Sequence, residues 1–287
     1  MSASSPGVGV LGSLRRDCCG RWQASTVHRA KPRMLSVLRK AKQAVRWLCW
    51  RMARAGALQV LRIATRGRVV AGSCAGLQLA ARDVFGAAGA KLLGTYEAEL
   101  TPQLARISAL APQVFVDVGG ADGYFAVGLA RQWQCKVIVF ESLAGAREVI
   151  ACNAALNNIS VSIDLRGDCD EPGLHALLEQ QATPGFLLME VEGAVLDLIS
   201  ARVAHALRAW QVLIESHDFA RPGCLQALER RLSPAHRLQR IRSRPRGLDD
   251  FPLHLLLPDT HKLQLMDEER PGVMTWLVAQ PRSESQQ

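Results

Sequence analysis

Four apolar runs between residues 113 and 215 lie next to residues that can do chemistry. Asp117 precedes the glycine-rich turn Gly119–Gly123, Glu141 follows the run KVIVF, Glu190 follows FLLM, and His217 lies just after QVLIE. If these runs are parallel strands, their carboxyl ends meet at one edge of a sheet, where α/β proteins bind their ligands. Carboxylates and a histidine there suit hydrogen bonding to a polar ligand and proton transfer.

The turn after the first run excludes two common nucleotide motifs. When the dinucleotide pattern G-x-G-x-x-G is aligned on Gly120 and Gly123, its first glycine falls on Val118, and no G-x-x-x-x-G-K-[ST] stretch is present. The carboxylate of Asp117 would repel a pyrophosphate at the start of the following helix. It suits a cationic ligand such as S-adenosylmethionine, which carries a sulfonium and an ammonium group.

Glu141 has two interpretations. It lies 22 residues after Gly119, at the end of the second run. A carboxylate at this position can accept two hydrogen bonds from a ribose diol. It can equally cap the helix that follows, and the residue alone does not decide between these roles.

The elements that must position these residues alternate along the chain. Apolar β-rich runs over 113–118, 136–140, 161–165, 186–191 and 211–215 alternate with helical patterns over 124–133, 142–157, 172–181, 194–207 and 223–232. This alternation predicts an α/β fold with a doubly wound parallel sheet. Two more apolar runs follow, over 238–242 and 274–279. No helical pattern is evident next to the last of them, so we expect the final pair of strands to be antiparallel.

Three stretches resemble a known family. VFVDVGGADGYF, VIVFES and LLMEVEGAVLDLI are similar to segments of class I S-adenosylmethionine-dependent methyltransferases, in particular the FkbM-like group. The resemblance spans about Tyr96 to Ala279 and implies a mostly parallel, seven-stranded, Rossmann-like methyltransferase fold. It implies cofactor contacts from these residues: Asp117, Gly119, Ala121, Gly123, Glu141, Asp168 and Glu190. Glu190 stands where the family usually has Asp, and Gly94–Glu97 resembles a segment that can lie over the cofactor.

The acceptor side depends on the ends of the fourth and fifth runs. Glu190 and Glu192 are two positions apart, so both point to one face of a strand. Histidine titrates closest to neutral pH, which makes His217 the candidate general base and Glu192 the second catalytic candidate. A divalent metal held by Glu190, Glu192, His217 and Asp218 is an alternative, but nothing in the spacing requires it and we expect no metal.

The resemblance implies O-methylation of a hydroxylated small molecule or sugar. Two alternatives stay open: an rRNA or tRNA methyltransferase that uses a basic arm, and a relative that binds the cofactor without turnover. MEVEGAV stands where methyltransferases acting on bases or amides often carry N/D-P-P-[YF], which argues against that class. A nucleic-acid partner is therefore possible but not favoured.

The charge divides the chain into an arm and a body. The net charge is +9, yet residues 1–70 hold 15 Lys and Arg and a single acid, which makes the remainder slightly acidic. We expect a disordered basic arm over 1–33, a helical N-terminal extension over 34–110 and the S-adenosylmethionine-binding methyltransferase domain over 111–281. A basic whole-protein charge is therefore poor support for nucleic-acid binding by the body.

The extension opens with a basic amphipathic pattern. Apolar residues from Met34 to Met52 recur at spacings of four and three, with Lys and Arg between them. This helix either docks on the body or touches anionic lipid or nucleic acid. No apolar stretch is long enough to cross a membrane, and the eight scattered cysteines form no C-x-x-C pair, so we expect a cytoplasmic protein with reduced thiols.

Overall fold

The computed structural model describes residues 14–16, 22–24, 32–82 and 86–282. These residues form two compact units, Met1–Met52 and Ala53–Gln287. In the first, β1 (Leu14–Arg16) and β2 (Trp22–Ala24) pair antiparallel, and α1 (Pro32–Thr65) begins. Most of the arm expected over 1–33 lies outside the described residues, so its disorder stays a prediction.

The second unit is built on a seven-stranded sheet. Its order is β5 (Ile163–Arg166), β4 (Lys136–Phe140), β3 (Val114–Val118), β6 (Phe186–Met189), β7 (Gln211–Ser216), β9 (Thr275–Pro281) and β8 (His236–Arg242). The first five are parallel, and β9 is antiparallel to both of its neighbours. The predicted doubly wound, mostly parallel, seven-stranded sheet is confirmed. Val118 pairs with both Phe140 and Met189, so the carboxyl ends of β3, β4 and β6 lie level.

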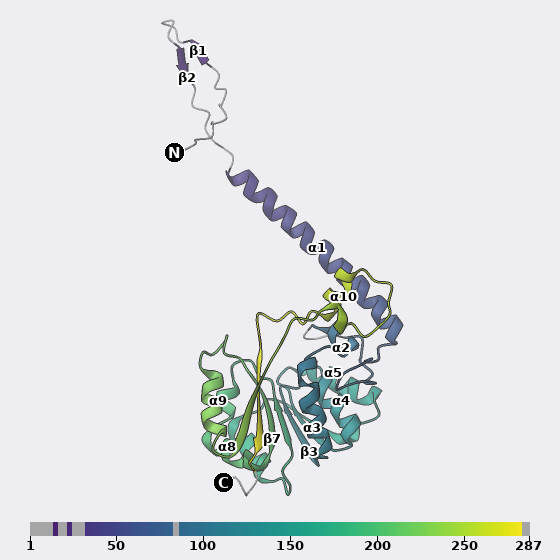
Figure 1. Cartoon of the computed structure of the whole chain (residues 1–287), viewed down its shortest axis with the longest axis vertical. Coiled ribbons are helices and arrows are strands. Elements are labelled where there is room, and N and C mark those ends of the chain that lie inside the picture. The colour runs from purple at the N-terminus through teal and green to yellow at the C-terminus, as the bar shows by residue number, and fades with distance from the viewer. Residues whose placement is uncertain (1–13, 17–21, 25–31, 83–85, 283–287) are drawn as a thin grey trace, which may run out of the picture. The chain divides into compact units, whose positions relative to one another are not determined.

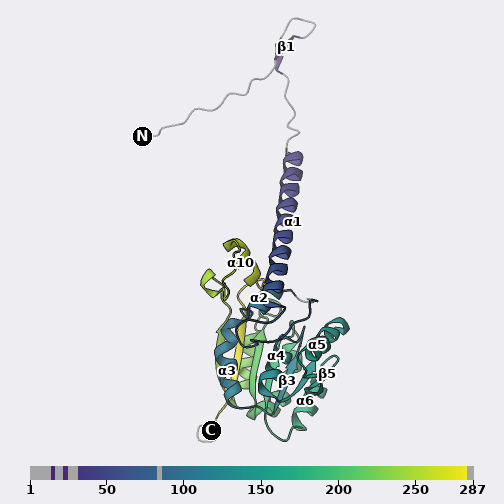
Figure 2. The ribbon, with the colours of Figure 1, turned by 90° about the vertical axis from the view of Figure 1, so that its right-hand side faces the viewer.

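Helices cover both faces of this sheet (Figure 1). One face carries α3 (Thr101–Ala109), α4 (Tyr124–Trp133) and α5 (Ala144–Leu156), which face the viewer in Figure 2. The other carries α6 (Glu171–Glu179), α7 (Val195–Leu198), α8 (Ala201–Ala206) and α9 (Cys224–Leu232). Phe115 and Phe186 pack on the first face, whereas Val116 and Leu187 pack on the second, as the alternation of side chains along a strand requires.

One predicted helix is divided. The single helix expected over 194–207 is two short helices, α7 and α8, followed by a 3-10 turn at Leu207–Ala209. The division falls at Ser200, whose backbone is extended and whose Oγ accepts a hydrogen bond from the amide of Val203 at 3.2 Å. This N-cap starts a new helix, which apolar periodicity alone does not reveal.

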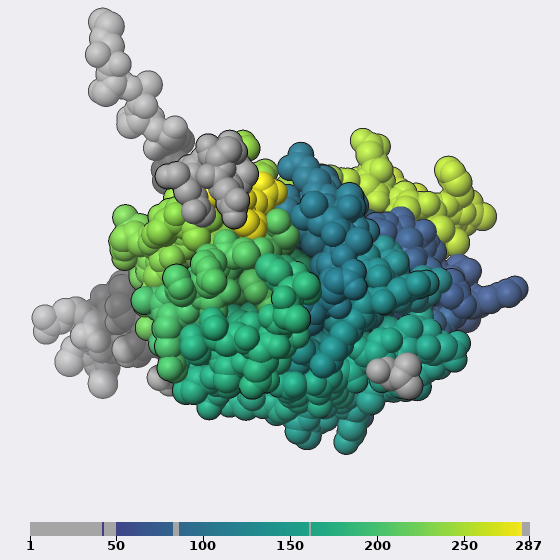
Figure 3. Space-filling model, turned by 90° about the horizontal axis from the view of Figure 1, so that it is seen from below, coloured from purple at the N-terminus to yellow at the C-terminus, as the bar shows by residue number. Residues whose placement is uncertain are grey.

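The helical extension expected over 34–110 is interrupted, because the described residues between α1 and α2 form turns and loops. It contains α2 (Ala88–Leu93), a 3-10 turn (Ala98–Leu100) and α3, whose outward-facing residues are exposed (Figure 3). Leu104 of α3 and Leu77 join the sheet core. Leu61 of α1 packs in a separate cluster with Leu93 and with Met266 of α10 (Asp259–Met266). A further 3-10 turn covers Leu248–Asp250.

Across the described ranges, no helix combines the length and apolarity that crossing a membrane requires.

Candidate functional site

A cavity of about 820 Å³ opens at the carboxyl edge of the parallel strands. Most of the predicted site residues line it, from the loops after five strands: Gly119, Ala121, Glu141, Asp168, Glu190, Glu192 and His217. Asp117 lies in a smaller recess that shares Gly119, Tyr96 and Glu190 with this cavity. Gly123 lies apart from the lining, at the N-terminus of α4. The fold thus gathers residues that are about a hundred positions apart in the chain.

The glycine turn brings two loops into contact. Gly119 has φ of +90°, and a Cβ there would lie 2.0 Å from the carbonyl oxygen of Glu190. Its amide and that of Gly120 both donate to the carbonyl oxygen of Phe140, at 2.9 and 3.1 Å. Only glycine meets both conditions, because any side chain would push the ends of β3 and β6 apart. The turn therefore presents backbone, not side chains, to the cavity.

Asp117 is a buried carboxylate with an unsatisfied oxygen. It is 2% exposed, and its Oδ1 has no hydrogen-bond partner among the described residues. Burial, and then the nearby carboxylates of Glu190 and Glu141, raise the pKa of Asp117 well above its usual range. Such a group is costly unless a cation or donor satisfies it, so the recess fits a ligand that presents a positive charge beside the glycine turn.

Glu141 caps the helix that follows it and can still accept hydrogen bonds from a ribose. Its Oε2 accepts a hydrogen bond from the amide of Ala121, and its Oε1 accepts one from the amide of Leu143, both at 2.8 Å. Leu143 is the residue before α5, so Glu141 ties the glycine turn to the start of that helix. Each carboxylate oxygen has a second lone pair, which leaves capacity for a ribose hydroxyl. Asp168 is exposed and accepts from the amide of Cys169 at 3.1 Å.

His217 is buried in the cavity wall, not displayed on a surface loop. The residue is 4% exposed, and its Nε2 lies 3.2 Å from Oε2 of Glu215. Its Nδ1 has no hydrogen-bond partner among the described residues. With the proton on Nε2, the ring donates to Glu215, and Nδ1 is left as a proton acceptor. A histidine oriented by a carboxylate in this way is a recurring general-base arrangement.

Sequence reasoning missed a cluster of carboxylates around Arg270. Glu97, Glu190 and Glu215 each place an oxygen within 4.8 Å of the other two. Arg270 forms ion pairs with Glu97, with Glu215 at 2.5 Å and with Glu268 at 2.7 Å. Glu215 is the penultimate residue of β7 and Glu190 directly follows β6, so the position of Glu215 near a strand end was available as a signal. Nothing in the local sequence points to Arg270, which follows α10.

The metal-binding alternative that included Asp218 is wrong in its ligand set. Asp218 accepts hydrogen bonds from the hydroxyl of Ser216 and from the amides of Gly223 and Leu225, the latter two at 3.1 Å. These contacts fix the start of α9, and the carboxylate is outside the cavity lining. Asp218 is therefore a helix cap and does not join Glu190, Glu192 and His217.

Tyr96 supports the acidic side of the cavity. Its hydroxyl donates to Oε1 of Glu190 at 3.5 Å, and its ring has the guanidinium of Arg270 at 5.7 Å from the centroid. Burial, and then the charge of Glu215, raise the pKa of Glu190 to about 7. Glu190 is thus an acid that changes charge near neutral pH.

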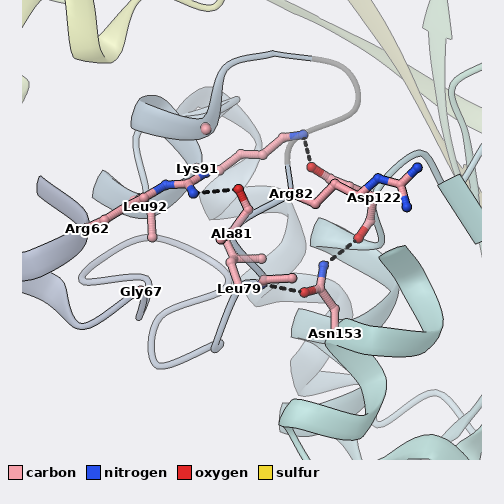
Figure 4. A pocket seen from close by; sticks show the side chains of 11 residues that line it. Arg62, Gly67, Leu79, Ala81, Arg82, Lys91, Leu92, Asp122 and Asn153 are labelled. Atoms are coloured by element: carbon pink, nitrogen blue, oxygen red, sulfur yellow. Dashed lines mark hydrogen bonds and ion pairs between the residues drawn. The ribbon is translucent and has the colours of Figure 1, made fainter. Parts of the chain in front are cut away.

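A buried ion pair holds the other side of the glycine turn. Lys91 Nζ lies 2.5 Å from Oδ2 of Asp122, and both side chains are less than a tenth exposed. Figure 4 shows this pair beside a small pocket, with Asn153 donating to the carbonyl of Asp122 at 2.8 Å. Lys91 also lines the large cavity. The charge of Lys91 is therefore already neutralised by Asp122, which lies outside the lining of the large cavity.

Comparison with known proteins gives similarity in structure alone. No protein-family model and no curated protein matches the chain. An O-methyltransferase from Bacillus cereus, solved with S-adenosylhomocysteine, has a TM-score of 0.44 and 14% identity, over 80% of this chain and 91% of that one. The O-methyltransferase TomG from Streptomyces achromogenes, solved with S-adenosylmethionine, has a TM-score of 0.43 and 12% identity, over 64% and 81%. Geranyl diphosphate C-methyltransferase from Streptomyces coelicolor has a TM-score of 0.40 and 10% identity, over 67% and 81%.

Proposed function

We propose that this protein is an S-adenosylmethionine-dependent methyltransferase of the FkbM-like type that methylates a hydroxyl group of a small molecule. The observation that carries the proposal is Asp117, a buried carboxylate with an unsatisfied oxygen beside a glycine turn, at the edge where α/β sheets bind ligands. Burial and the neighbouring carboxylates raise the pKa of Asp117, and a bound cation would lower it again and favour the charged carboxylate. A ligand with an ammonium and a sulfonium would therefore be held beside Asp117, whereas a phosphate-bearing dinucleotide would bring another negative charge to this acidic recess.

The cofactor contacts follow from positions around the cavity. Asp117 would accept from the ammonium group, the backbone of Gly119 and Ala121 would border the methionine part, and Glu141 would accept from the ribose hydroxyls. Asp168, on the loop after β5, would face the adenine. Glu190 would lie near the sulfonium side. When bound, S-adenosylmethionine supplies a methyl group that a nucleophile displaces in line from sulfur.

The protein's own part in the reaction is to hold the acceptor and to remove its proton. His217 and Glu192 follow the ends of β7 and β6, on the wall of the same cavity. With Nε2 donating to Glu215, Nδ1 of His217 takes the proton of the acceptor hydroxyl. Glu192 is exposed and faces the acceptor from the cavity mouth. Holding the reacting atoms in line supplies most of the remaining acceleration.

A transfer assay with labelled methyl groups tests the proposal across many acceptors at once. Purified full-length protein and methyl-labelled S-adenosylmethionine are incubated with the small-molecule fraction of a cell extract and, separately, with total RNA. We expect label in the small-molecule fraction. Label in RNA would favour the nucleic-acid alternative, and its absence from both would favour a protein that binds without turnover.

His217→Gln is the matched variant in the same assay. Glutamine is close to histidine in size and can still donate a hydrogen bond, but its amide cannot act as a base. We therefore expect turnover to fall by roughly 10²–10⁴-fold. Binding of S-adenosylhomocysteine should stay within a few-fold of the unmodified protein. Loss of binding would instead make His217 a structural residue.

A cytoplasmic location, inferred from the cysteines, remains part of this proposal.

A further inference from the structure

The wall of the large cavity is strongly negative. Ten carboxyl groups line it, against two permanent cations, Lys91 and Arg270. Lys91 forms an ion pair with Asp122, outside the cavity lining, and Arg270 forms ion pairs with three glutamates. Along the part of this wall that the structure describes, both cations are therefore already neutralised, and an anionic acceptor would find repulsion rather than a partner.

Several of the lining carboxylates have partners within the fold. Glu171 pairs with Arg202 and Asp197 with Arg221, both at the outer surface. Glu192 differs from them. It lines the cavity and is exposed, and no cation lies within ion-pair distance of it in the described ranges. Its charge is consequently free to meet a ligand.

An aromatic side chain lies on the neighbouring loop. Phe219 lines the cavity and is 61% exposed, so a ligand in the cavity can reach its ring. A Cβ on Gly193 would lie 3.9 Å from Cβ of Ala220, so the loop of Glu192 and the loop of Phe219 run side by side. An aromatic face next to a carboxylate is the combination that holds an ammonium group.

The buried floor below these residues also lacks a partner. The ring of Phe219 lies 5.5 Å from that of His217, between centroids. Nδ1 of His217 is without a hydrogen-bond partner among the described residues, although the ring is 4% exposed and lines the cavity. A ligand that bridges mouth and floor would therefore present a cation to Glu192 and Phe219 and a hydroxyl to His217.

We propose that the acceptor is a cation: a small hydroxylated molecule that also carries a protonated amine, bound with its ammonium group between Glu192 and Phe219. The inference rests on the proposed function, because the same cavity must hold the cofactor. The cofactor's ammonium and sulfonium face Asp117 and Glu190. The carboxylate of Glu192, on the exposed side of the cavity, is then available to the acceptor.

Matched pairs of small probes test the charge preference directly. Full-length protein is first titrated with S-adenosylhomocysteine and then, when saturated, with tyramine or its neutral analogue 4-ethylphenol. A second pair is trans-4-aminocyclohexanol and 4-methylcyclohexanol. At low salt we expect each cation to bind about tenfold more tightly than its neutral partner, as a charged hydrogen bond provides.

Two variants locate the preference. Glu192→Gln should remove most of it, whereas Glu179→Gln, on the exposed surface of α6 and outside the cavity lining, should leave it unchanged. Equal binding of cation and neutral analogue in both pairs would overturn the inference. So would one equivalent of Mn²⁺ that binds tightly and displaces the amines, since the carboxylates would then be a metal site. Failure of S-adenosylhomocysteine to bind would refute the proposed function instead.

Discussion

The sharpest prediction on stability concerns the charge of Glu190. Burial, and then the neighbouring Glu215, raise the pKa of Glu190 to about 7, from 4.5 for an ordinary glutamate. Arg270, Lys91 and His217 oppose this rise but do not cancel it. The folded protein therefore holds a proton on Glu190 that the unfolded chain releases between these two pH values.

The sign and size of the effect follow from this difference. Where the folded state binds more protons, stability falls as pH rises, so the fold loses stability from about pH 5 to pH 8. A pKa that moves from 4.5 to about 7 corresponds to about 3 kcal/mol. Because the side chain is only half-buried, we expect about 2–3 kcal/mol. For a domain of this size that amounts to roughly 5–10 °C in Tm.

Glu190→Gln tests this reasoning, because glutamine resembles the protonated acid and cannot ionise. The variant should match the unmodified protein near pH 5 and exceed its Tm by roughly 5–10 °C at pH 8, measured by thermal unfolding across the pH range. Glu179→Gln, on the exposed surface of α6 and outside the cavity lining, is the control and should leave the pH dependence unchanged. Equal Tm values for Glu190→Gln and the unmodified protein at pH 8 would refute the argument.

Three further predictions concern the glycine turn. Asp117→Asn should leave the fold intact, because burial already favours the uncharged form of this carboxyl in the ligand-free protein, but weaken S-adenosylhomocysteine binding by roughly 10–150-fold in calorimetry; unchanged affinity would exclude Asp117 from the site. Glu141→Gln should weaken S-adenosylhomocysteine binding and also lower the free energy of unfolding in urea by about 1–3 kcal/mol. The two oxygens of Glu141 accept from the amides of Ala121 and Leu143, and the single oxygen of glutamine can replace only one of them. Lys91→Met should cost about 3–5 kcal/mol in urea because Asp122 is left buried without its cation, and a loss below about 1 kcal/mol would show that the pair is dispensable.

Much of the fold followed from local patterns. Apolar runs such as Val114–Val118 and Lys136–Phe140 predict strands within a residue or two, and their alternation with helical patterns predicts the parallel sheet. The division at Ser200 did not follow, because a single hydroxyl decides it against an otherwise continuous helical pattern.

The site was predicted only where its residues directly follow a strand. Glu141, Glu190 and His217 do, Asp117 is the penultimate residue of β3, and the sheet brings all four to one edge. The partners of Arg270 lie 55 and 173 residues away from it, at Glu215 and Glu97. A pairing over such separations depends on packing in three dimensions, so neither spacing nor composition reveals it.

One titration tests the central claim most directly. S-adenosylhomocysteine and NAD⁺ are each added to the full-length protein in a calorimeter, because the two ligands share adenosine but differ in charge beside the glycine turn. We expect one bound S-adenosylhomocysteine per chain, with its affinity reduced by Asp117→Asn, and no binding of NAD⁺. Binding of NAD⁺ without binding of S-adenosylhomocysteine would contradict it.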